Sequence, residues 1–496
     1  MYCELRTATL SGIDALPVDV QVHVASGLPA FHIVGMGDVA VKEARQRVTA
    51  ALRSCGFKLP NSCITVNLAP ALVQKHGTGF DLAMALGILI ASGQASVDRA
   101  SQLLVLGELG LQGQVSTVAG LVSCARLANE QGRILMTPHP EQLEGIIACQ
   151  TIPIEHLSEI AQLQERPVKA VARDEAVSSG GLDFADVAGQ SRVIRALCVA
   201  AAGQLSVFMV GPPGTGKTML ASRLPSIMAP LSREEFLEVA LVASAMGRTL
   251  DDICAQRPFR NPHHSASPVG IIGGGSPIKP GEITLAHNGV LFLDEMPQFA
   301  PVTLQALRQP LEEGCVRIVR AQESVVLPAR VMLVGAANPC PCGYYGDKEK
   351  RCHCAPAEIQ SYQNRIGGPL MDRFDMVLYA SRPPLEELFA TRPKQRGLSS
   401  AELRAQVIAA RDYAQDHHER PVKELEREEL CSETMISPAA LKLLQRSAER
   451  LLLSPRALVR VGRVARIIAD MQQSELTEEE HLIEALSYRV SLFERS

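Results

Sequence analysis

One octapeptide has the composition of a loop that binds phosphate. It fits the pattern G-x-x-x-x-G-K-[ST] and reads Gly211-Pro212-Pro213-Gly214-Thr215-Gly216-Lys217-Thr218. The apolar run 207–210 precedes it and a helical pattern, 218–228, follows, which argues against a chance Gly-Pro loop. Glycines let backbone N–H groups turn toward phosphate oxygens, and a helix N-terminus adds partial positive charge. We therefore expect Lys217 to bridge the β- and γ-phosphates of a nucleotide such as ATP, and Thr218 to bind Mg²⁺.

Two further apolar runs end in polar side chains. Run 290–293 leads into Asp294 and Glu295, and run 331–335 leads to Asn338. Because such runs suit parallel strands buried on both faces, these side chains are expected at the edge where ligands bind. Asp294 is the predicted Mg²⁺ partner and Glu295 the base that polarises the attacking water. Asn338 would orient that water or contact the γ-phosphate, although an Asn before a proline is also common in turns.

Four of the thirteen cysteines lie within fifteen residues. Cys340, Cys342, Cys352 and Cys354 have the spacing C-x-C-x9-C-x-C. Four thiolates can enclose one tetrahedral Zn²⁺ and leave no open position, so the predicted role is structural. The paired spacing is tighter than in common zinc knuckles, and His353 could replace one sulfur. Free thiols in a reducing compartment are the alternative.

The composition excludes several classes of protein. Hydrophobic residues make up 46% of the 496 residues, which is enough for large cores and excludes a disordered, collagen-like or coiled-coil chain. The net charge of −4 means that nucleic acid would have to bind at local basic clusters. Apolar runs are shorter than the ~20 residues of a spanning helix, and no signal peptide is apparent. We expect a cytoplasmic protein that does not bind membranes.

The chain is predicted to be a multidomain α/β protein. Residues 1–165 alternate strands with amphipathic helices, for example strands at 18–24 and 64–68 and helices at 38–52 and 80–90, which indicates an α+β domain. Residues 166–181 lose this periodicity and end in Ser-Ser-Gly-Gly, as linkers do. Residues 182–385 hold the phosphate loop and the buried parallel strands. Residues 386–496 are predicted to form a helical lid.

Motifs outside the phosphate loop make a family resemblance specific. The core order of loop, Asp-Glu strand, Asn-ended strand and helical lid resembles the AAA+ ATPases. Within them, three stretches resemble the magnesium-chelatase-like branch and its bacterial competence helicases: 257–264 (RPFRNPHH), 272–276 (IGGGS) and 280–290 (PGEITLAHNGV). The resemblance covers nearly the whole chain. It implies a ring-forming, hexameric, ATP-dependent DNA helicase or translocase that promotes branch migration of recombination intermediates in natural transformation. The implied partners are single- or double-stranded or branched DNA, further copies of the chain, and recombination proteins.

The resemblance also implies roles for basic residues. Arg373, in Asp372-Arg373-Phe374-Asp375, matches the arginine finger that reaches a neighbouring subunit's γ-phosphate, with Arg365 as the alternative. Arg456 matches the sensor arginine of the lid, on a helix face with Arg460 and Arg463 that could instead be a solvated basic face. Two pore loops, one in the helix-2 insertion and one a hairpin at 316–327, supply the candidate DNA contacts Lys279, Arg317 and Arg320.

Residues 1–165 resemble the Lon-protease-like domain. The resemblance rests on 77–82 (GTGFDL) and 107–113 (GELGLQG). An active domain of this type needs a serine nucleophile and a lysine base, but the matching segments read Gly77-Thr78-Gly79-Phe80 and, at 119–124, AGLVSC. We therefore expect an inactive scaffold or DNA-binding platform. A metal-chelatase-type motor, an ATP-dependent protease and a nucleotide-switched DNA-binding scaffold are the alternative functions.

Overall fold

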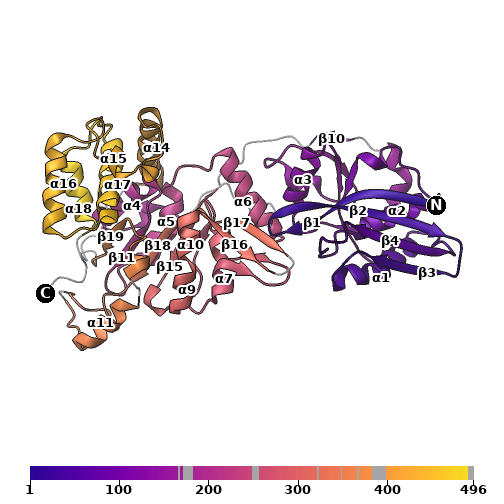
Figure 1. Ribbon diagram of the computed structural model, residues 1–496, viewed down its shortest axis with the longest axis horizontal. Coiled ribbons are helices and arrows are strands. Elements are labelled where there is room, and N and C mark those ends of the chain that lie inside the picture. The colour runs from indigo at the N-terminus through magenta and orange to yellow at the C-terminus, as the bar shows by residue number, and fades with distance from the viewer. Residues whose placement is uncertain are drawn as a thin grey trace.

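The computed structural model describes residues 1–165, 168–170, 182–248, 256–320, 323–347, 349–365, 368–382 and 398–489. The chain forms an elongated molecule with a sheet domain at one end, a second sheet in the middle and a helical region at the other end (Figure 1). This is a multidomain α/β fold with a parallel-sheet core and a helical C-terminal region. Among the described residues, no helix combines the length and apolarity needed to cross a bilayer.

The N-terminal sheet has eight strands in the order β10-β9-β8-β5-β1-β2-β4-β3. Strand β2 (Asp14–Ala25) buries alternate residues from Val18 to Val24, which explains its apolar/polar pattern. Helix α1 (Val39–Ser54) and the almost fully buried helix α2 (Asp81–Ala91) confirm both predicted helices. The other elements are β1 (Tyr2–Ser11), β3 (Ala30–Val34), β4 (Cys63–Ala69), β5 (Leu103–Val105), β8 (Ile134–Thr137), β9 (Gln150–Pro153) and α3 (Leu121–Glu130).

Strand β10 (Lys169–Ala170) pairs with β9 in this first sheet. It lies beyond residue 165, where we expected the domain to end and the linker to begin. Its two residues hold ladder hydrogen bonds that a local loss of hydrophobic period does not reveal. Residues 171–181 of the predicted linker lie outside the described residues.

The central sheet has five parallel strands in the order β12-β15-β18-β11-β19. Strands β11 (Val207–Val210), β15 (Val290–Leu293) and β18 (Met332–Ala337) are buried at every residue, as predicted from their continuous apolar runs. Strands β12 (Phe259–Arg260) and β19 (Met376–Tyr379) form the two edges. Helices α4 (Ser191–Gly203), α5 (Lys217–Ile227) and α6 (Arg233–Ala245) accompany this sheet.

The C-terminal region is helical, with α14 (Ser400–His417), α15 (Arg427–Leu430), α16 (Pro438–Arg450), α17 (Pro455–Met471) and α18 (Glu479–Ser487). Ser454 caps α17, since its side chain accepts a hydrogen bond from the Ala457 N–H. Helix α17 packs against α4, α14 and α18, and its buried face joins the hydrophobic core of the central sheet. The helical region is therefore fastened to the central sheet.

Within the described ranges, the N-terminal domain contacts the central domain at two places. The Gly120 N–H donates to the Ser244 carbonyl at 2.8 Å, and the Ser11 hydroxyl donates to Glu323 at 2.7 Å. Around the first contact, Ala240 and Leu241 of α6 are buried in a core cluster with residues of α3. The second contact involves a hairpin of β16 (Cys315–Val319) and β17 (Ser324–Pro328), in the region where a hairpin was predicted.

Candidate functional site: a nucleotide site and an arginine cavity

The phosphate loop lies between the end of β11 and the start of α5. Its glycines are required by geometry: Gly214 and Gly216 have φ of +79° and +80°, where other residues are strained. A Cβ on Gly211 would lie 2.1 Å from the Ala380 carbonyl oxygen at the end of β19. The loop is therefore folded tightly against the edge of the sheet at which the parallel strands end.

The structure brings Lys217 of this loop into contact with Asn338, which follows β18. The Lys217 ammonium donates to the Gly211 carbonyl at 2.8 Å, the Pro212 carbonyl at 3.0 Å and the Asn338 side-chain oxygen at 3.1 Å. Burial lowers the pKa of Lys217, and the charges of Asp294 and Glu295 oppose that shift. A desolvated ammonium held by neutral oxygens is suited to bind a phosphate anion in their place.

Thr218 and Asp294 also meet. The Thr218 hydroxyl donates to an Asp294 carboxylate oxygen at 2.7 Å. Hydroxyl and carboxylate oxygens are ligands that Mg²⁺ accepts, so the donor set fits the predicted ion. Glu295 follows with a left-handed φ of +47° and an exposed side chain, and its N–H donates to Asp294 at 2.9 Å. This sharp turn frees the Glu295 carboxylate from the strand.

Sequence reasoning missed Gln190, which precedes α4. Its side-chain amide donates to the Thr215 carbonyl at 3.2 Å and also to the Ser381 carbonyl. One side chain thus ties the phosphate loop to the segment after β19. The Gly189-Gln190 turn before a helical pattern is a weak signal, since its partners are distant in sequence.

Arg373 lies at the opposite end of the parallel strands, where they begin. It precedes β19. Two residues further on, the Asp375 carboxylate accepts a hydrogen bond from the Ser206 N–H, just before β11, at 2.8 Å. The Arg373 guanidinium forms an ion pair with Glu312 on α10 (Arg308–Glu313). The phosphate loop follows β11, whereas Arg373 lies before the strands begin. Arg373 and the phosphate loop of one chain are therefore at opposite ends of the parallel strands.

Arg456 lines the same cavity as Arg373, together with Arg460 and Arg463. The cavity measures about 1350 Å³. Burial, followed by the charges of Arg456 and Arg460, lowers the pKa of Arg373. Arg460 is buried, 4.0 Å from Asp375, and Arg463 donates to the Leu425 carbonyl at 3.0 Å. Arg460 and Arg463 therefore pack over the start of β19, whereas Arg456 is exposed, so the solvated basic face stays the alternative for Arg456.

Arg365, the alternative finger, is exposed at the end of α11 (Pro356–Asn364). It follows the cysteine segment and, although it is only eight residues before Arg373, it does not line the cavity that holds Arg373 and Arg456. The two candidate arginines thus have different surroundings, which makes them separable by substitution.

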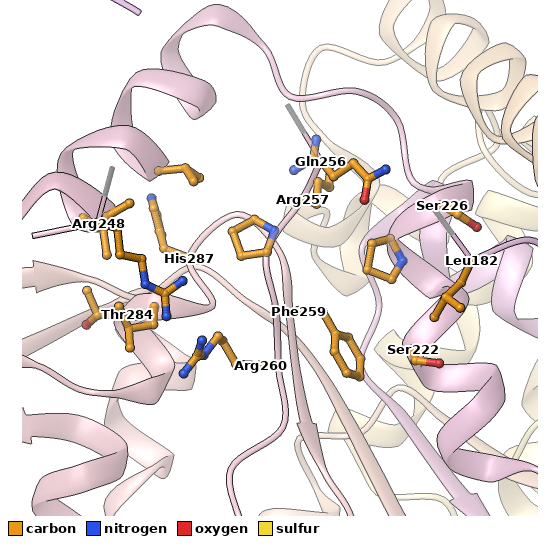
Figure 2. Close-up of a pocket in the computed structure, with 16 residues that line it drawn as sticks. Leu182, Ser222, Ser226, Arg248, Gln256, Arg257, Phe259, Arg260, Thr284 and His287 are labelled. Carbon is orange, nitrogen blue, oxygen red and sulfur yellow. The ribbon is translucent and has the colours of Figure 1, made fainter. Parts of the chain in front are cut away.

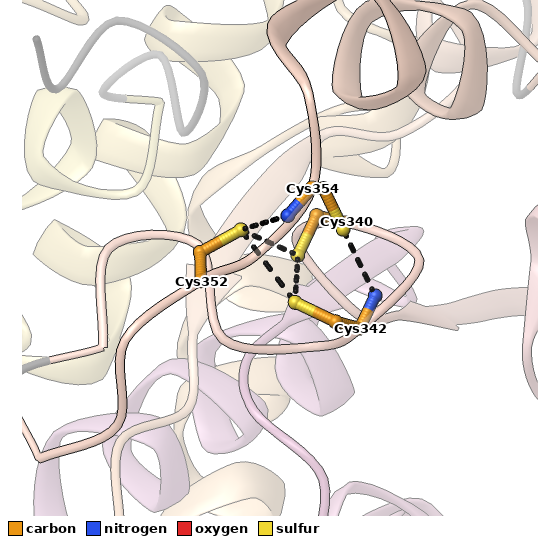
Figure 3. Close-up of side chains that lie close together, drawn as sticks. All are labelled: Cys340, Cys342, Cys352 and Cys354. Carbon is orange, nitrogen blue, oxygen red and sulfur yellow. Dashed lines mark hydrogen bonds between the residues drawn. The ribbon is translucent and has the colours of Figure 1, made fainter.

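The four cysteines converge on one point (Figure 3). Their sulfur atoms all lie within 4.8 Å of one another, and His353 is exposed outside the group. Partial burial and hydrogen bonds from the backbone at His353 and Tyr344 act in opposite directions, and the pKa of Cys342 falls to about 6. Burial raises the pKa of Cys340 to about 12. The cluster is compatible with a zinc site.

The candidate DNA contacts come from two neighbouring ribbons. Lys279 lies in the ribbon of β13 (Gly273–Gly274) and β14 (Lys279–Pro280), and Arg317 lies in β16. A Cβ on Gly273 would be 3.4 Å from the Ile318 side chain, so the ribbons touch. Lys279, Arg317 and Arg320 are all exposed, although Arg317 pairs with Glu313 at 3.2 Å.

Three successive segments of the chain match models of protein families. Residues 20–140 match the family described as subunit ChlI of Mg-chelatase, residues 183–388 match magnesium chelatase, subunit ChlI, and residues 397–489 match its C-terminal part. The chain is 40% identical to competence protein ComM of Haemophilus influenzae over 96% of this chain and 95% of that protein. The chain belongs to the magnesium-chelatase-like ComM family. It is also 39% identical to the uncharacterized protein YifB of Escherichia coli, over 98% of this chain and 96% of YifB.

A shorter similarity concerns Lon. The chain is 29% identical to Lon protease 2 of Bacillus subtilis over 38% of this chain and 39% of that protein. In the two segments where a Lon-type dyad was sought, the hydroxyl groups have other partners. Thr78 donates to Glu108 at 2.5 Å, and buried Ser123 donates to the Ile13 carbonyl at 2.6 Å. Neither contact is one between a nucleophile and a lysine base.

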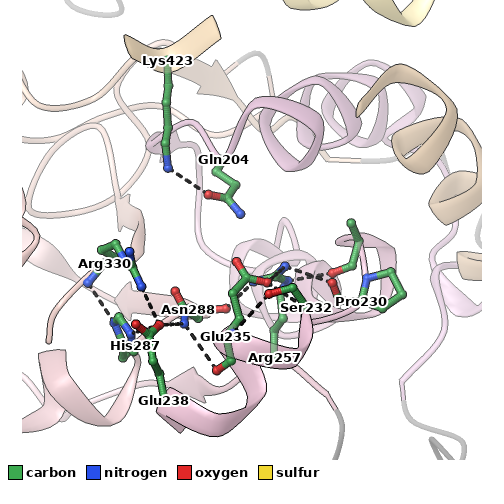
Figure 4. Close-up of polar contacts among 11 residues, drawn as sticks. Gln204, Pro230, Ser232, Glu235, Glu238, Arg257, His287, Asn288, Arg330 and Lys423 are labelled. Carbon is green, nitrogen blue, oxygen red and sulfur yellow. Dashed lines mark hydrogen bonds and ion pairs between the residues drawn. The ribbon is translucent and has the colours of Figure 1, made fainter. Parts of the chain in front are cut away.

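Two of the three stretches that carried the family resemblance, 257–264 and 280–290, contribute Arg257, His287 and Asn288 to one polar network (Figure 4). Arg257, buried, donates to Glu235 at 2.8 Å and to the carbonyls of Ala229 and Asn288, each at 2.7 Å. His287 and Asn288 contact Glu238 at 3.0 and 2.8 Å. In this ComM-family chain these residues therefore fix α6 to the start of β15, which is a structural role.

A cavity of about 370 Å³ lies beside this network (Figure 2). Side chains of α5, α6 and the edge strand β12 line it, including Ser222, Val239 and Phe259. Arg260 in its wall is paired with Glu282 at 2.7 Å. Helix α5 contributes Ser222, Pro225 and Ser226 to the lining, and no residue of the phosphate loop lines this cavity.

Proposed function

We propose that this protein is a ring-forming, hexameric ATPase that binds DNA and promotes branch migration of recombination intermediates in natural transformation. The family supports a competence-associated AAA+ ATPase. ComM of Haemophilus influenzae is named a competence protein and matches nearly the full chain. Helicase or translocase action, DNA binding and the ring belong to the proposal.

One observation carries the ring. Lys217, Thr218, Asp294 and Asn338 gather where the parallel strands end, whereas Arg373 lies where they begin. An arginine finger at the opposite end of the strands cannot reach the nucleotide of its own chain. It can reach the nucleotide of a second copy that packs against that end. Such a head-to-tail contact is heterologous. It produces a closed ring when the rotation from one subunit to the next is a whole fraction of 360°.

The residues of the site divide the chemistry among them. Lys217 and the backbone of the loop would hold the phosphates of ATP, while Thr218 and Asp294 would hold Mg²⁺. The ion neutralises developing charge on the phosphates. Glu295 would accept a proton from the attacking water, which Asn338 orients, and Arg373 from the neighbouring copy would stabilise the transition state. Arg456, in the same cavity as Arg373, would then act at that same interface.

DNA is supported by the two ribbons. The two ribbons touch, and they carry the exposed cations Lys279, Arg317 and Arg320. Movement of one ribbon would therefore displace the other. Cations of this kind contact phosphates without reading sequence, as a translocating motor requires. Hydrolysis that shifts the lid against the core would move both ribbons along the strand.

A labelled four-way DNA junction tests the proposal. The protein with ATP is expected to convert the junction into two duplexes, and Lys217→Ala protein is expected to leave it unchanged because the phosphates lose their cation. Arg427→Ala, in an exposed ion pair far along the chain, is the matched control with full activity. Junctions that are bound in the presence of ATP but never resolved would contradict branch migration and favour a nucleotide-switched DNA-binding scaffold.

The family name itself favours one second candidate, a metal-chelatase-type motor. The family matches of all three segments are to a magnesium-chelatase subunit. Such a motor would hydrolyse ATP at a rate that DNA does not change. DNA dependence of the ATPase rate therefore separates the two functions.

A further inference from the structure

The cysteine cluster has the dimensions of a tetrahedral zinc site. Cys340 Sγ lies 3.3 Å from Cys342 Sγ and 3.7 Å from Cys352 Sγ, and the last two sulfurs are 3.5 Å apart. Four sulfurs at about 2.3 Å from one Zn²⁺ would be about 3.8 Å from each other. These three sulfurs therefore need only a small expansion to hold the ion, and Cys354 Sγ lies within 4.8 Å of each of them.

Backbone groups already surround these sulfurs as they do around metal-bound thiolates. The Tyr345 N–H donates to Cys340 Sγ at 3.3 Å, the Cys342 N–H to Cys354 Sγ at 3.4 Å and the Cys354 N–H to Cys352 Sγ at 3.4 Å. Such outer hydrogen bonds orient ligands and stabilise their negative charge. They form an observation independent of the sulfur distances.

The loop that carries the cysteines forms one wall of the phosphate site. It begins directly after Asn338, and Gly343 in it packs on the phosphate loop: a Cβ there would lie 2.7 Å from Pro213 Cδ and 3.8 Å from Asn338 Cγ. Gly343 has a φ of +87°, so both its conformation and its lack of a side chain serve this approach.

The far side of the same loop is fastened to the segment after β19. Arg382 pairs with Glu349 at 2.8 Å and with Asp347 at 3.5 Å, and it lies over the Tyr344 ring. The preceding residue, Ser381, accepts the hydrogen bond from Gln190, which also holds the phosphate loop. The cysteine loop is thus joined to the phosphate loop by two routes.

We propose that these four cysteines bind one zinc ion, and that the ion sets the affinity of the neighbouring site for nucleotide by fixing Asn338 and the Gly343 wall. Zinc binds thiolates, so the cysteines that are still protonated release their protons to solvent on binding. The ion is fully enclosed by sulfur, so it takes no part in hydrolysis. This inference rests on the proposed nucleotide site, but zinc binding itself does not.

The test compares the full-length protein with Cys342→Ser and Cys352→Ser variants, with Cys63→Ser as the matched control. Cys63 is a free, partly buried cysteine in β4 of the N-terminal domain, outside the cluster. Metal content is measured by mass spectrometry after dialysis, and affinity for a fluorescent ATP analogue is measured without DNA. We expect one zinc per chain in wild type and control, loss of zinc in both variants, and an affinity about tenfold weaker, as for one lost hydrogen bond to a charged group.

A chelator experiment on the wild type guards against variants that fail to fold. Stripping the metal should weaken nucleotide binding by the same factor, and adding Zn²⁺ should restore it. Wild-type protein without zinc after growth with added zinc would overturn the site. Zinc loss with unchanged nucleotide affinity would overturn the coupling. Failure of wild type to bind nucleotide while it holds zinc would instead contradict the proposed function.

Discussion

Mixing two inactive variants tests whether Arg373 serves a neighbouring copy. Glu295→Gln removes the base but leaves the phosphate loop intact, and Arg373→Ala removes the finger. Within one chain the two functions cannot meet. Strand β11 has four residues and rises about 3.3 Å per residue. Its two ends, one at the phosphate loop and the other on the side of Arg373, are therefore about 13 Å apart. Each homogeneous variant is therefore expected to lose about 10³-fold or more of the ATPase rate, as finger losses do.

A mixture should recover activity at interfaces that combine the two intact halves. An active interface needs Glu295 from an Arg373→Ala chain and Arg373 from a Glu295→Gln chain. Random assembly of equal amounts gives that combination at about one quarter of interfaces, whatever the ring size, if interfaces act independently. The expected rate is about a quarter of wild type, measured by phosphate release after the subunits have been mixed and allowed to exchange.

A mixture whose rate equals the mean of its two components would refute the assignment of Arg373 in trans. Light scattering on each variant provides the control that both still assemble. Arg365→Ala mixed with Glu295→Gln is the comparison that separates the two candidate fingers. Recovery with Arg365→Ala together with an active Arg373→Ala protein would move the finger to the end of α11.

Three other predictions concern stability and DNA. Glu235→Ala leaves the Arg257 guanidinium buried without its carboxylate, and urea unfolding should show a loss near 3 kcal/mol, toward the lower end of the usual range because Glu235 is 23% exposed; an unchanged midpoint would contradict the network. Burial lowers the pKa of His287 although Glu238 opposes the shift, so below about pH 6.5 the unfolded chain binds a proton that the folded chain does not. The free energy of unfolding should therefore fall as the pH drops from 6.5 through the lowered pKa, and less so in His287→Gln; equal pH profiles would refute this. Arg317→Ala with Arg320→Ala should make the salt dependence of DNA affinity shallower by roughly 0.9 in log–log slope per contact, and an unchanged slope would remove both from the DNA surface.

The sequence could predict whatever depends on neighbouring residues. The phosphate loop and the three buried strands beside it follow from local composition, and the structure has each of them. Asn338 could be placed near Lys217 because parallel strands end at a common edge. Local pattern and strand direction thus account for most of the nucleotide site.

What the sequence could not predict depends on distant packing. Arg460 has the helical spacing of a surface residue, but it is buried because α17 packs over the start of β19. Nothing local shows that Arg456 shares a cavity with Arg373, since they are far apart in the chain and meet through the position of the lid. Gln190 was missed for the same reason, because both of its partners are backbone carbonyls of remote segments.

The most direct test of a DNA-driven ATPase is its hydrolysis rate as a function of DNA concentration, for wild type and Glu295→Gln. We predict a wild-type rate that rises with DNA to a plateau, and a variant that binds nucleotide but shows no stimulated turnover. A wild-type rate that stays the same at every DNA concentration would contradict a DNA-driven motor and favour a motor of the metal-chelatase type.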